Sequence, residues 1–164
     1  MFVSIIFRLF RFRPEEFEDA SVERVLEVVP MKSDEEEFSA ALTAGDLFDL
    51  GQEWEVVHAA FTGGSQDVRE PEYQAVLGGD LFGRTETEIL VSQTPADVRT
   101  VARYLSGLDS WHQVIDNRAA MEAAHGGEIS DNFAHYVASR LDGLSAFYAE
   151  AAMKGDVVVK IAYS

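Results

Sequence analysis

The chain has 164 residues, a common size for one domain with one hydrophobic core. Hydrophobic residues make up 47% of it, which is typical of a packed globular protein rather than a disordered one. It has no cysteine, so a disulfide framework, a thiolate zinc site and a cysteine nucleophile are excluded. Its net charge of −16 repels the phosphates of nucleic acids and anionic membranes, so we expect neither as a partner.

The first expected element is a strand at residues 2–12 that carries apolar side chains on both faces. This run is too short to span a bilayer, and its charges do not follow the order of a secretory signal, so we expect a cytoplasmic protein. Two helices are predicted next, one over residues 14–29 and one over residues 33–42 with Ser33 as its cap.

Asp49 is the expected cap of a further helix, on which four side chains share one face: Trp54, Val57, His58 and Phe61. Residues 65–72 are expected to form an exposed loop, and residues 73–83 show no clear pattern. A short strand is predicted at residues 88–92. Thr94, followed by proline, begins a helix that Gly107 ends.

The C-terminal third predicts two helices and a strand. Residues 110–124 form the first helix, whose expected inward side chains are Trp111, Val114, Ile115 and Met121. A longer helix follows, with an apolar stripe at Phe133, Val137, Leu141, Leu144, Tyr148 and Ala151, and residues 157–163 alternate as a strand does. Strands at both ends with helices between them predict one α+β domain over residues 1–164, in which several helices pack on a small mixed or antiparallel sheet.

The charge is concentrated near the N-terminus. Ten acidic and two basic residues between residues 15 and 37 give this stretch a charge of −8, half of the total of −16. A run of charge is usually a solvated surface, but it also fits a patch for a basic protein partner. The residues of this candidate patch are Glu15, Glu16, Glu18, Asp19, Asp34, Glu35, Glu36 and Glu37.

Chemical motifs are weak throughout. The histidines at positions 58, 112, 125 and 135 are never three or four residues apart, so the sequence predicts no metal site, and it carries no cofactor motif. The sharpest candidate for a ligand pocket is Trp54 with His58, since a helix places them on one face, although a core histidine bonded to a backbone carbonyl is the simpler interpretation. Trp111 and His112 raise the same question, but helix neighbours point to different sides.

Several short segments form a recognisable set: the opening strand leading into residues 14–17, then Trp54, His58, Thr62 and Gly63, then Leu77, Gly78 and Gly79, and the closing run from Leu144 to Val158. With these segments the chain resembles the YfbM-like family of bacterial domains of unknown function. The resemblance covers nearly the whole chain, with a departure at His125, Gly126 and Gly127. It implies an α+β fold and a bacterial cytoplasmic protein, and it implies no activity or catalytic residue.

Two hypotheses for function follow. The first is a non-catalytic binding or protein-interaction module, of which an immunity or inhibitor protein against a basic partner is one form. The alternative is a small enzyme or ligand-binding protein with a pocket near Trp54 and His58. An enclosed cleft lined by His58 and several carboxylates would favour the alternative, and a packed His58 would favour the first.

Overall fold

The computed structural model describes residues 4–30 and 34–164. Its centre is an antiparallel sheet with the strand order β2-β1-β5-β4-β3, so the two terminal strands pair with each other in the middle. The strands are β1 (Ile6–Phe12), β2 (Leu47–Gly51), β3 (Asp80–Arg84), β4 (Glu88–Gln93) and β5 (Val157–Tyr163). The predicted α+β class is confirmed, and the sheet is antiparallel rather than mixed.

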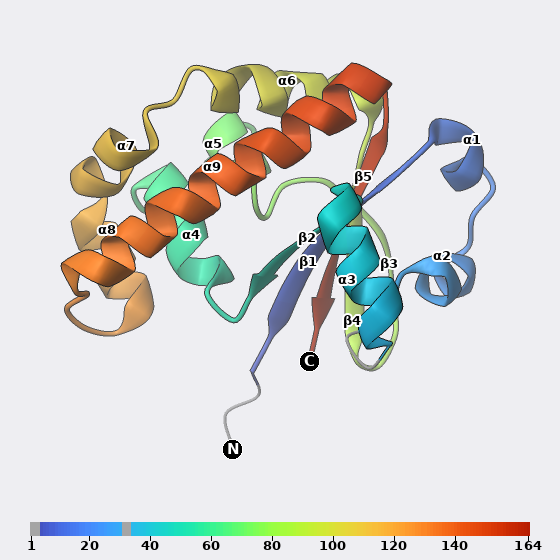
Figure 1. Cartoon of the computed structure of the whole chain (residues 1–164), viewed down its shortest axis with the longest axis horizontal. Coiled ribbons are helices and arrows are strands. Elements are labelled where there is room, and N and C mark those ends of the chain that lie inside the picture. The colour runs from blue at the N-terminus through green and yellow to red at the C-terminus, as the bar shows by residue number, and fades with distance from the viewer. Residues whose placement is uncertain (1–3, 31–33) are drawn as a thin grey trace.

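Helices cover both faces of this sheet (Figure 1). One face carries α4 (Trp54–Thr62), α5 (Pro71–Gln74), α6 (Pro95–Ser106), α7 (Ser110–Asp116), α8 (Arg118–His125) and α9 (Asp131–Lys154). The other carries α1 (Pro14–Phe17), α2 (Val22–Val28) and α3 (Glu35–Ala44). Two hydrophobic clusters result, one on each side of the sheet.

The alternation of β1 divides its side chains between these clusters. Phe7 and Leu9 belong to the larger cluster under α4 and α9, and Phe10 belongs to the smaller one under α1–α3. The same alternation turns Arg11 toward the face of Phe7 and Leu9, where it is 9% exposed. A guanidinium is therefore held inside the fold at the end of the central strand.

The structure corrects several boundaries. The helix expected over residues 14–29 is interrupted: α1 is one turn, and Ser21 caps α2 by accepting a hydrogen bond from the Arg24 amide at 3.1 Å. Asp49 lies in β2 and caps no helix, and residue Glu53 precedes α4 instead. The expected cap Ser33 lies outside the described residues. Helix α5 begins inside the loop expected over residues 65–72 and ends at Gln74, and most of β3 lies in residues 73–83, which showed no clear pattern.

The C-terminal half follows the predictions more closely. Thr94 and Asp97 form a reciprocal capping box at the start of α6. The apolar stripe of α9 is buried except at Phe133, which is half-buried. The helix expected over residues 110–124 is divided at Asn117 into α7 and α8, and Trp111 and Ile115 are 36% and 51% exposed rather than turned inward.

Candidate functional site: an acidic face with a pocket beside Arg11

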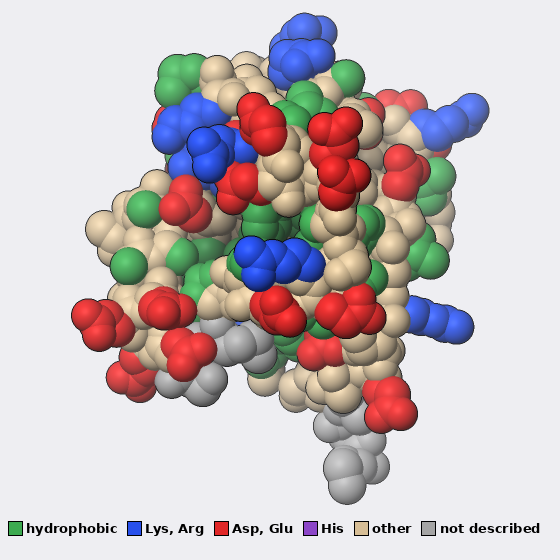
Figure 2. All heavy atoms as spheres, turned by 90° about the vertical axis from the view of Figure 1, so that its right-hand side faces the viewer, with side chains coloured by type: hydrophobic (Ala, Val, Ile, Leu, Met, Phe, Trp, Pro, Cys, Tyr) green, Lys and Arg blue, Asp and Glu red, His purple; other side chains and the backbone are tan. Residues whose placement is uncertain are grey.

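The acidic residues singled out in the sequence lie together on the side of α1, α2 and α3. All eight candidates are exposed: Glu15, Glu16, Glu18, Asp19, Asp34, Glu35, Glu36 and Glu37. Figure 2 shows this side, where acidic side chains gather around a hollow in which hydrophobic side chains are visible. We call it the acidic face.

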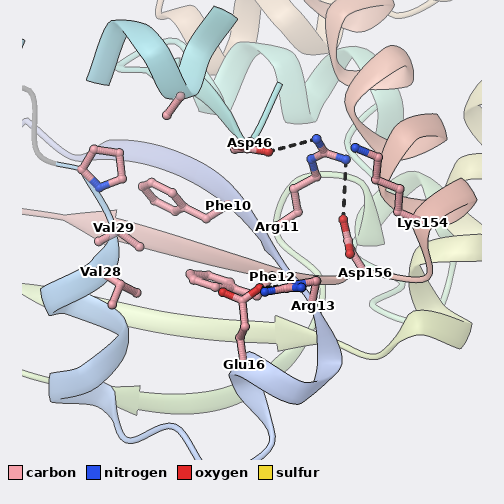
Figure 3. Close-up of a pocket in the computed structure, with 12 residues that line it drawn as sticks. Phe10, Arg11, Phe12, Arg13, Glu16, Val28, Val29, Asp46, Lys154 and Asp156 are labelled. Atoms are coloured by element: carbon pink, nitrogen blue, oxygen red, sulfur yellow. Dashed lines mark hydrogen bonds and ion pairs between the residues drawn. The ribbon is translucent and has the colours of Figure 1, made fainter. Parts of the chain in front are cut away.

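The hollow is a cavity of about 620 Å³, which we call the Arg11 pocket. Its apolar part comes from β1 and α2, as Figure 3 shows, with Phe10 and Phe12 opposite Val28 and Val29. Its polar end is formed where β2, α9 and β5 meet, by Arg11, Asp46, Lys154 and Asp156. An apolar floor with charged groups at one end suits an amphipathic side chain or a small ligand.

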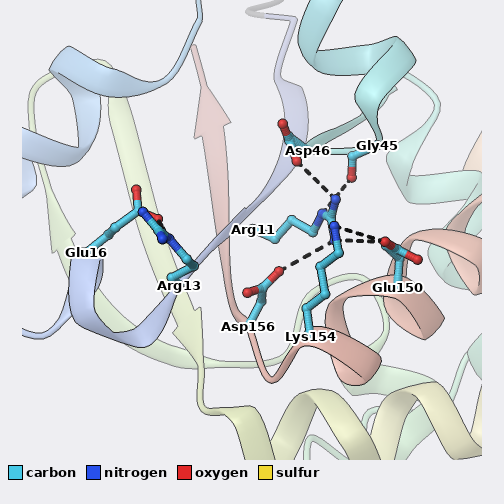
Figure 4. A network of polar contacts seen from close by, with 8 residues as sticks. All are labelled: Arg11, Arg13, Glu16, Gly45, Asp46, Glu150, Lys154 and Asp156. Carbon is cyan, nitrogen blue, oxygen red and sulfur yellow. Dashed lines mark hydrogen bonds and ion pairs between the residues drawn. The ribbon is translucent and has the colours of Figure 1, made fainter.

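Arg11 joins the elements at the polar end (Figure 4). Its Nε donates to the carbonyl oxygen of Gly45 at 2.8 Å, and Nη2 donates to Asp46 Oδ1 at 3.0 Å. Its Nη1 is buried and lies 3.5 Å from Asp156 Oδ2 and 3.9 Å from Glu150 Oε1, and it donates no hydrogen bond to any described residue. One buried cation is therefore shared among three carboxylates.

Two of these carboxylates differ in their exposure to water. The side chain of Asp46 is 61% exposed, whereas that of Asp156 is 8% exposed. Burial raises the pKa of Asp156, and the charges of Arg11 and Lys154 offset part of that effect. At the mouth of the pocket Arg13 pairs with Glu16, with 2.6 Å between Nε and Oε1.

Trp54 and His58 do line a second, smaller cavity of about 290 Å³, together with Tyr73 and one carboxylate, Glu55. The His58 ring meets Tyr73 edge to face, with 4.8 Å between ring centroids. Its Nδ1 is buried and has no hydrogen-bond partner among the described residues. Burial first and the charge of Lys160 second lower the pKa of His58 to about 4, so the ring is neutral at pH 7.

Trp111 and His112 are not brought to this cavity. Both lie on the outside of α7, where Trp111 stacks on His135 with 4.1 Å between ring centroids. His112 Nδ1 lies 3.2 Å from a carboxylate oxygen of Asp109, the residue that caps the helix. Each residue therefore makes a contact on the protein surface, and the two do not line a common pocket.

The sequence interpretation missed Lys160, the middle of β5, which is fully buried. Its Nζ donates to the carbonyl oxygens of Gln74 and Gly78, and Gln93 Nε2 donates to the same Gln74 oxygen at 2.8 Å. Tyr148 donates from its hydroxyl to Gln93 Oε1 at 2.6 Å. Burial lowers the pKa of Lys160 well below its ordinary value. The sequence did contain one indication that Lys160 is buried, because it lies between apolar residues in the predicted C-terminal strand.

Metal and membrane contacts can be assessed for the described part of the chain. Within residues 4–30 and 34–164, no three His, Asp or Glu side chains come together as a metal site would require. Over the same residues, no helix combines the length and the apolar character needed to cross a bilayer.

The fold and site together define an α+β domain with one antiparallel sheet, helices on both faces, and an open pocket beside a shared buried arginine. The chain belongs to the family described as a domain of unknown function, DUF1877, whose model matches residues 3–161. It is similar to a solved structure described as a protein of unknown function, YfbM, from Escherichia coli.

That likeness has a TM-score of 0.60 at 16% identity and covers 96% of this chain and 99% of the other. At this identity it supports the fold alone, and the expected membership of a YfbM-like family is confirmed. Among curated proteins, none matches the chain.

Proposed function

We propose that the chain is a non-catalytic binding domain that holds a basic protein partner on the acidic face. The observation that carries the proposal is the coincidence of exposed carboxylates with the Arg11 pocket on one side of the fold. Charged surface alone is usually just solvated. A cavity with an apolar floor beside it gives a partner a place to bury a side chain, and such anchors supply most of the binding free energy in interfaces.

The charge balance of this face supports the proposal. Two arginines among its described residues are paired with acids: Arg13 with Glu16, and Arg24 with Glu27, between exposed side chains. Arg11 is surrounded by carboxylates of its own chain. Lys and Arg side chains of a partner would meet a surface on which exposed acids outnumber the described basic residues, and long-range attraction would speed the encounter. An immunity or inhibitor protein against a basic target is one form of such a domain.

The floor of the pocket supports an apolar anchor. Val28 is 47% exposed, and Phe12 is half-buried beside it. An aliphatic or aromatic side chain seated there would remove this surface from water, at about 25 cal/mol for each Å² of apolar area. The partner is therefore expected to carry an apolar residue flanked by Lys or Arg.

The test compares two variants with the same change in net charge. One neutralises the acidic face with Glu35→Gln, Glu36→Gln and Glu37→Gln, and the control neutralises exposed acids elsewhere with Glu86→Gln, Asp116→Asn and Glu128→Gln. Proteins captured from the source cells on the wild type are purified and their affinities measured by calorimetry. We expect a basic protein that the wild type and the control bind equally, and that the acidic-face variant binds at least about tenfold more weakly. Equal affinities of the two variants for the captured protein would contradict the proposal.

The cavity near Trp54 and His58 favours a second candidate function, the binding of a small molecule. Its specific support is the buried Nδ1 of a neutral His58, a polar atom without a partner among the described residues. A fragment screen followed by NMR at the Trp54 indole tests it, with His58→Ala as the variant. Ligand shifts that vanish in a folded His58→Ala protein would favour this function, and shifts that persist would exclude it.

A further inference from the structure

A third cavity, of about 420 Å³, lies between α4, α5, α6 and α7. In Figure 1 these helices are on the opposite side of the molecule from α1–α3, so this cavity is separate from the acidic face. Aromatic side chains, carboxylates and amides line it, and among its described lining residues there is no Lys, Arg or His. Such a lining offers many acceptors and no positive charge.

Glu72 is one of the acidic residues that line this cavity. Its Oε2 is buried, and no described residue donates a hydrogen bond to it. Buried acceptors in folded proteins nearly always have a donor, and a lone carboxylate oxygen costs more than a neutral one. A donor supplied by a ligand would offset the cost of leaving this oxygen unpaired.

The two amides in the lining each commit one of their two N–H donors to a backbone carbonyl oxygen. Asn117 Nδ2 donates to the carbonyl oxygen of Ala60 at 2.7 Å, and Gln113 Nε2 donates to that of Phe61 at 3.2 Å. Their positions are thereby fixed against α4. The carboxylates of the lining are acceptors without donors of their own, so they match a ligand that brings donors.

Two tyrosines supply aromatic walls. Tyr73 and Tyr104 line the cavity beside Glu72, and both are half-buried. Burial first and the charge of Glu72 second raise the pKa of Tyr104, which indicates that the carboxylate and the phenol are close. The other acids of the lining are Asp67, which pairs with the exposed Arg69 at 3.3 Å, and Glu70.

We propose that this cavity binds an organic cation, a guanidinium or primary ammonium group, held by the Glu72 carboxylate with its apolar stem against Tyr73 and Tyr104. A cation over aromatic faces is attracted by their negative π-surface, and N–H groups of the cation satisfy the buried oxygen. The cation could be a free small molecule or the side chain of an arginine or lysine of another protein. The recognising chemistry is the same, and the experiment separates the two sources.

The probes are butylguanidinium and butylurea, which have nearly the same shape but differ in charge. Binding is followed by NMR, from the shifts of Tyr73, Tyr104 and the Glu72 amide during titration at moderate salt. We expect saturable shifts at these residues with butylguanidinium and none with butylurea. Equal shifts with both probes, or shifts confined to α1–α3, would overturn the proposal, the latter because the cation is then merely attracted to the acidic face.

Two variants assign the binding to Glu72. Glu72→Gln keeps the size of the side chain and removes its charge, and the matched control Glu86→Gln removes an exposed charge elsewhere. We expect the affinity for butylguanidinium to fall about tenfold or more in Glu72→Gln and to stay unchanged in the control. Melting temperatures check that both variants are folded. An unchanged affinity in Glu72→Gln would refute the role of this carboxylate.

A tripeptide separates the two sources of the cation. Acetyl-Gly-Arg-Gly-amide presents the same guanidinium on a peptide backbone. Tighter binding of the tripeptide than of butylguanidinium supports a protein side chain as occupant, and tighter binding of butylguanidinium supports a free small cation. No binding of either probe would remove the proposal.

Discussion

Arg11 and Lys160 are both cations inside the fold, and their surroundings differ in kind. Arg11 is charge-compensated by the three carboxylates around it. Lys160 meets two backbone carbonyl oxygens, and among its described hydrogen-bond partners there is no carboxylate. Removing one partner of a buried ion pair leaves the other charge uncompensated. A lysine surrounded by carbonyl oxygens can instead lose its proton and, as a neutral amine, still donate two hydrogen bonds. The two residues therefore predict different responses to substitution and to pH.

Replacing Arg11 with Met removes the cation and leaves Asp156 almost buried without its counter-charge. We expect the free energy of unfolding to fall by about 2 to 4 kcal/mol, because the loss of one partner of a buried ion pair costs far more than the loss of a surface pair. Arg24→Met is the control, since Arg24 and Glu27 are exposed, and its cost should stay below about 1 kcal/mol. Denaturant unfolding at pH 7 measures both. Equal costs for the two variants would show that the Arg11 network contributes no more than a surface pair.

The lowered pKa of His58 predicts a loss of stability in acid. The unfolded ring takes up its proton near pH 6.5, whereas the folded ring does so near pH 4, so the unfolded state holds more protons between these values. This contribution to stability is therefore present above pH 6.5 and is lost as the pH falls toward 4. The free energy of unfolding should fall over this pH range by about 1 to 2 kcal/mol less in His58→Gln than in the wild type. This difference is smaller than the full pKa shift would give, because water still reaches part of the ring.

Denaturant unfolding from pH 7 to pH 4 tests this, with His125→Gln as the control for losing one exposed imidazole. NMR titration of the His58 ring gives its pKa directly. A ring that titrates at its ordinary value, or a His58→Gln protein with the pH dependence of the wild type, would contradict the prediction.

At the scale of elements, the sequence predicted those whose pattern is local. The stripe of α9 and the capping box of α6 lie within a few turns of one helix, and both were found. By contrast, β2 and β3 are five residues long each, and their stability comes from pairing with β1 and β4 rather than from their own pattern. The division before α2 depends on the side-chain cap of Ser21, and at Asn117 the side chain bonds to Ala60 on α4, a contact that the local pattern does not show.

The candidate site, too, has one part that the sequence predicted and one part that it did not. The acidic patch could be predicted because charged residues of a short segment reach the surface wherever it folds. The Arg11 pocket could not, because Asp46 and Asp156 come to Arg11 from segments far apart in the sequence. The period of two in β1 did contain one signal, since Arg11 continues the inward face of Phe7 and Leu9.

Helix α5 is held to the sheet by Lys160, and this contact predicts a pH response. The turn after α5 is tight at Gly78, where a Cβ would lie 2.3 Å from the Gln74 side chain, and its carbonyls point at the amine. Since the folded pKa lies below the unfolded value of 10.5, the unfolded state holds more protons in the range below 10.5. Stability should therefore rise as the pH approaches 10.5 from below, by up to about 1.4 kcal/mol per pH unit.

In Lys160→Met this rise should disappear, and Lys154→Met, which removes an exposed lysine, should keep it. Urea unfolding at several pH values in this range provides the measurement. If Lys160→Met kept the slope of the wild type, Lys160 would have to remain charged in the folded state.

At the scale of the whole molecule, the net charge of −16 opposes compaction. Salt shortens the range of this repulsion, from about 30 Å at 0.01 M to about 8 Å at 0.15 M. Arg11 and Asp156 are buried, so their interaction is screened less than the repulsion among exposed acids. The effect of salt on stability should therefore be set by the surface charges. We expect the free energy of unfolding to rise by on the order of 1 kcal/mol over this range of NaCl.

The same two triple variants locate the repulsion. Both lower the net charge equally, but only Glu35→Gln, Glu36→Gln and Glu37→Gln dilute the crowded acids of α3, where three carboxylates follow one another. Salt should therefore stabilise this variant less than the control with Glu86→Gln, Asp116→Asn and Glu128→Gln. Equal salt dependence in both variants would mean that the repulsion is spread over the molecule, and the acidic face would then lack the concentrated field that a basic partner is proposed to meet.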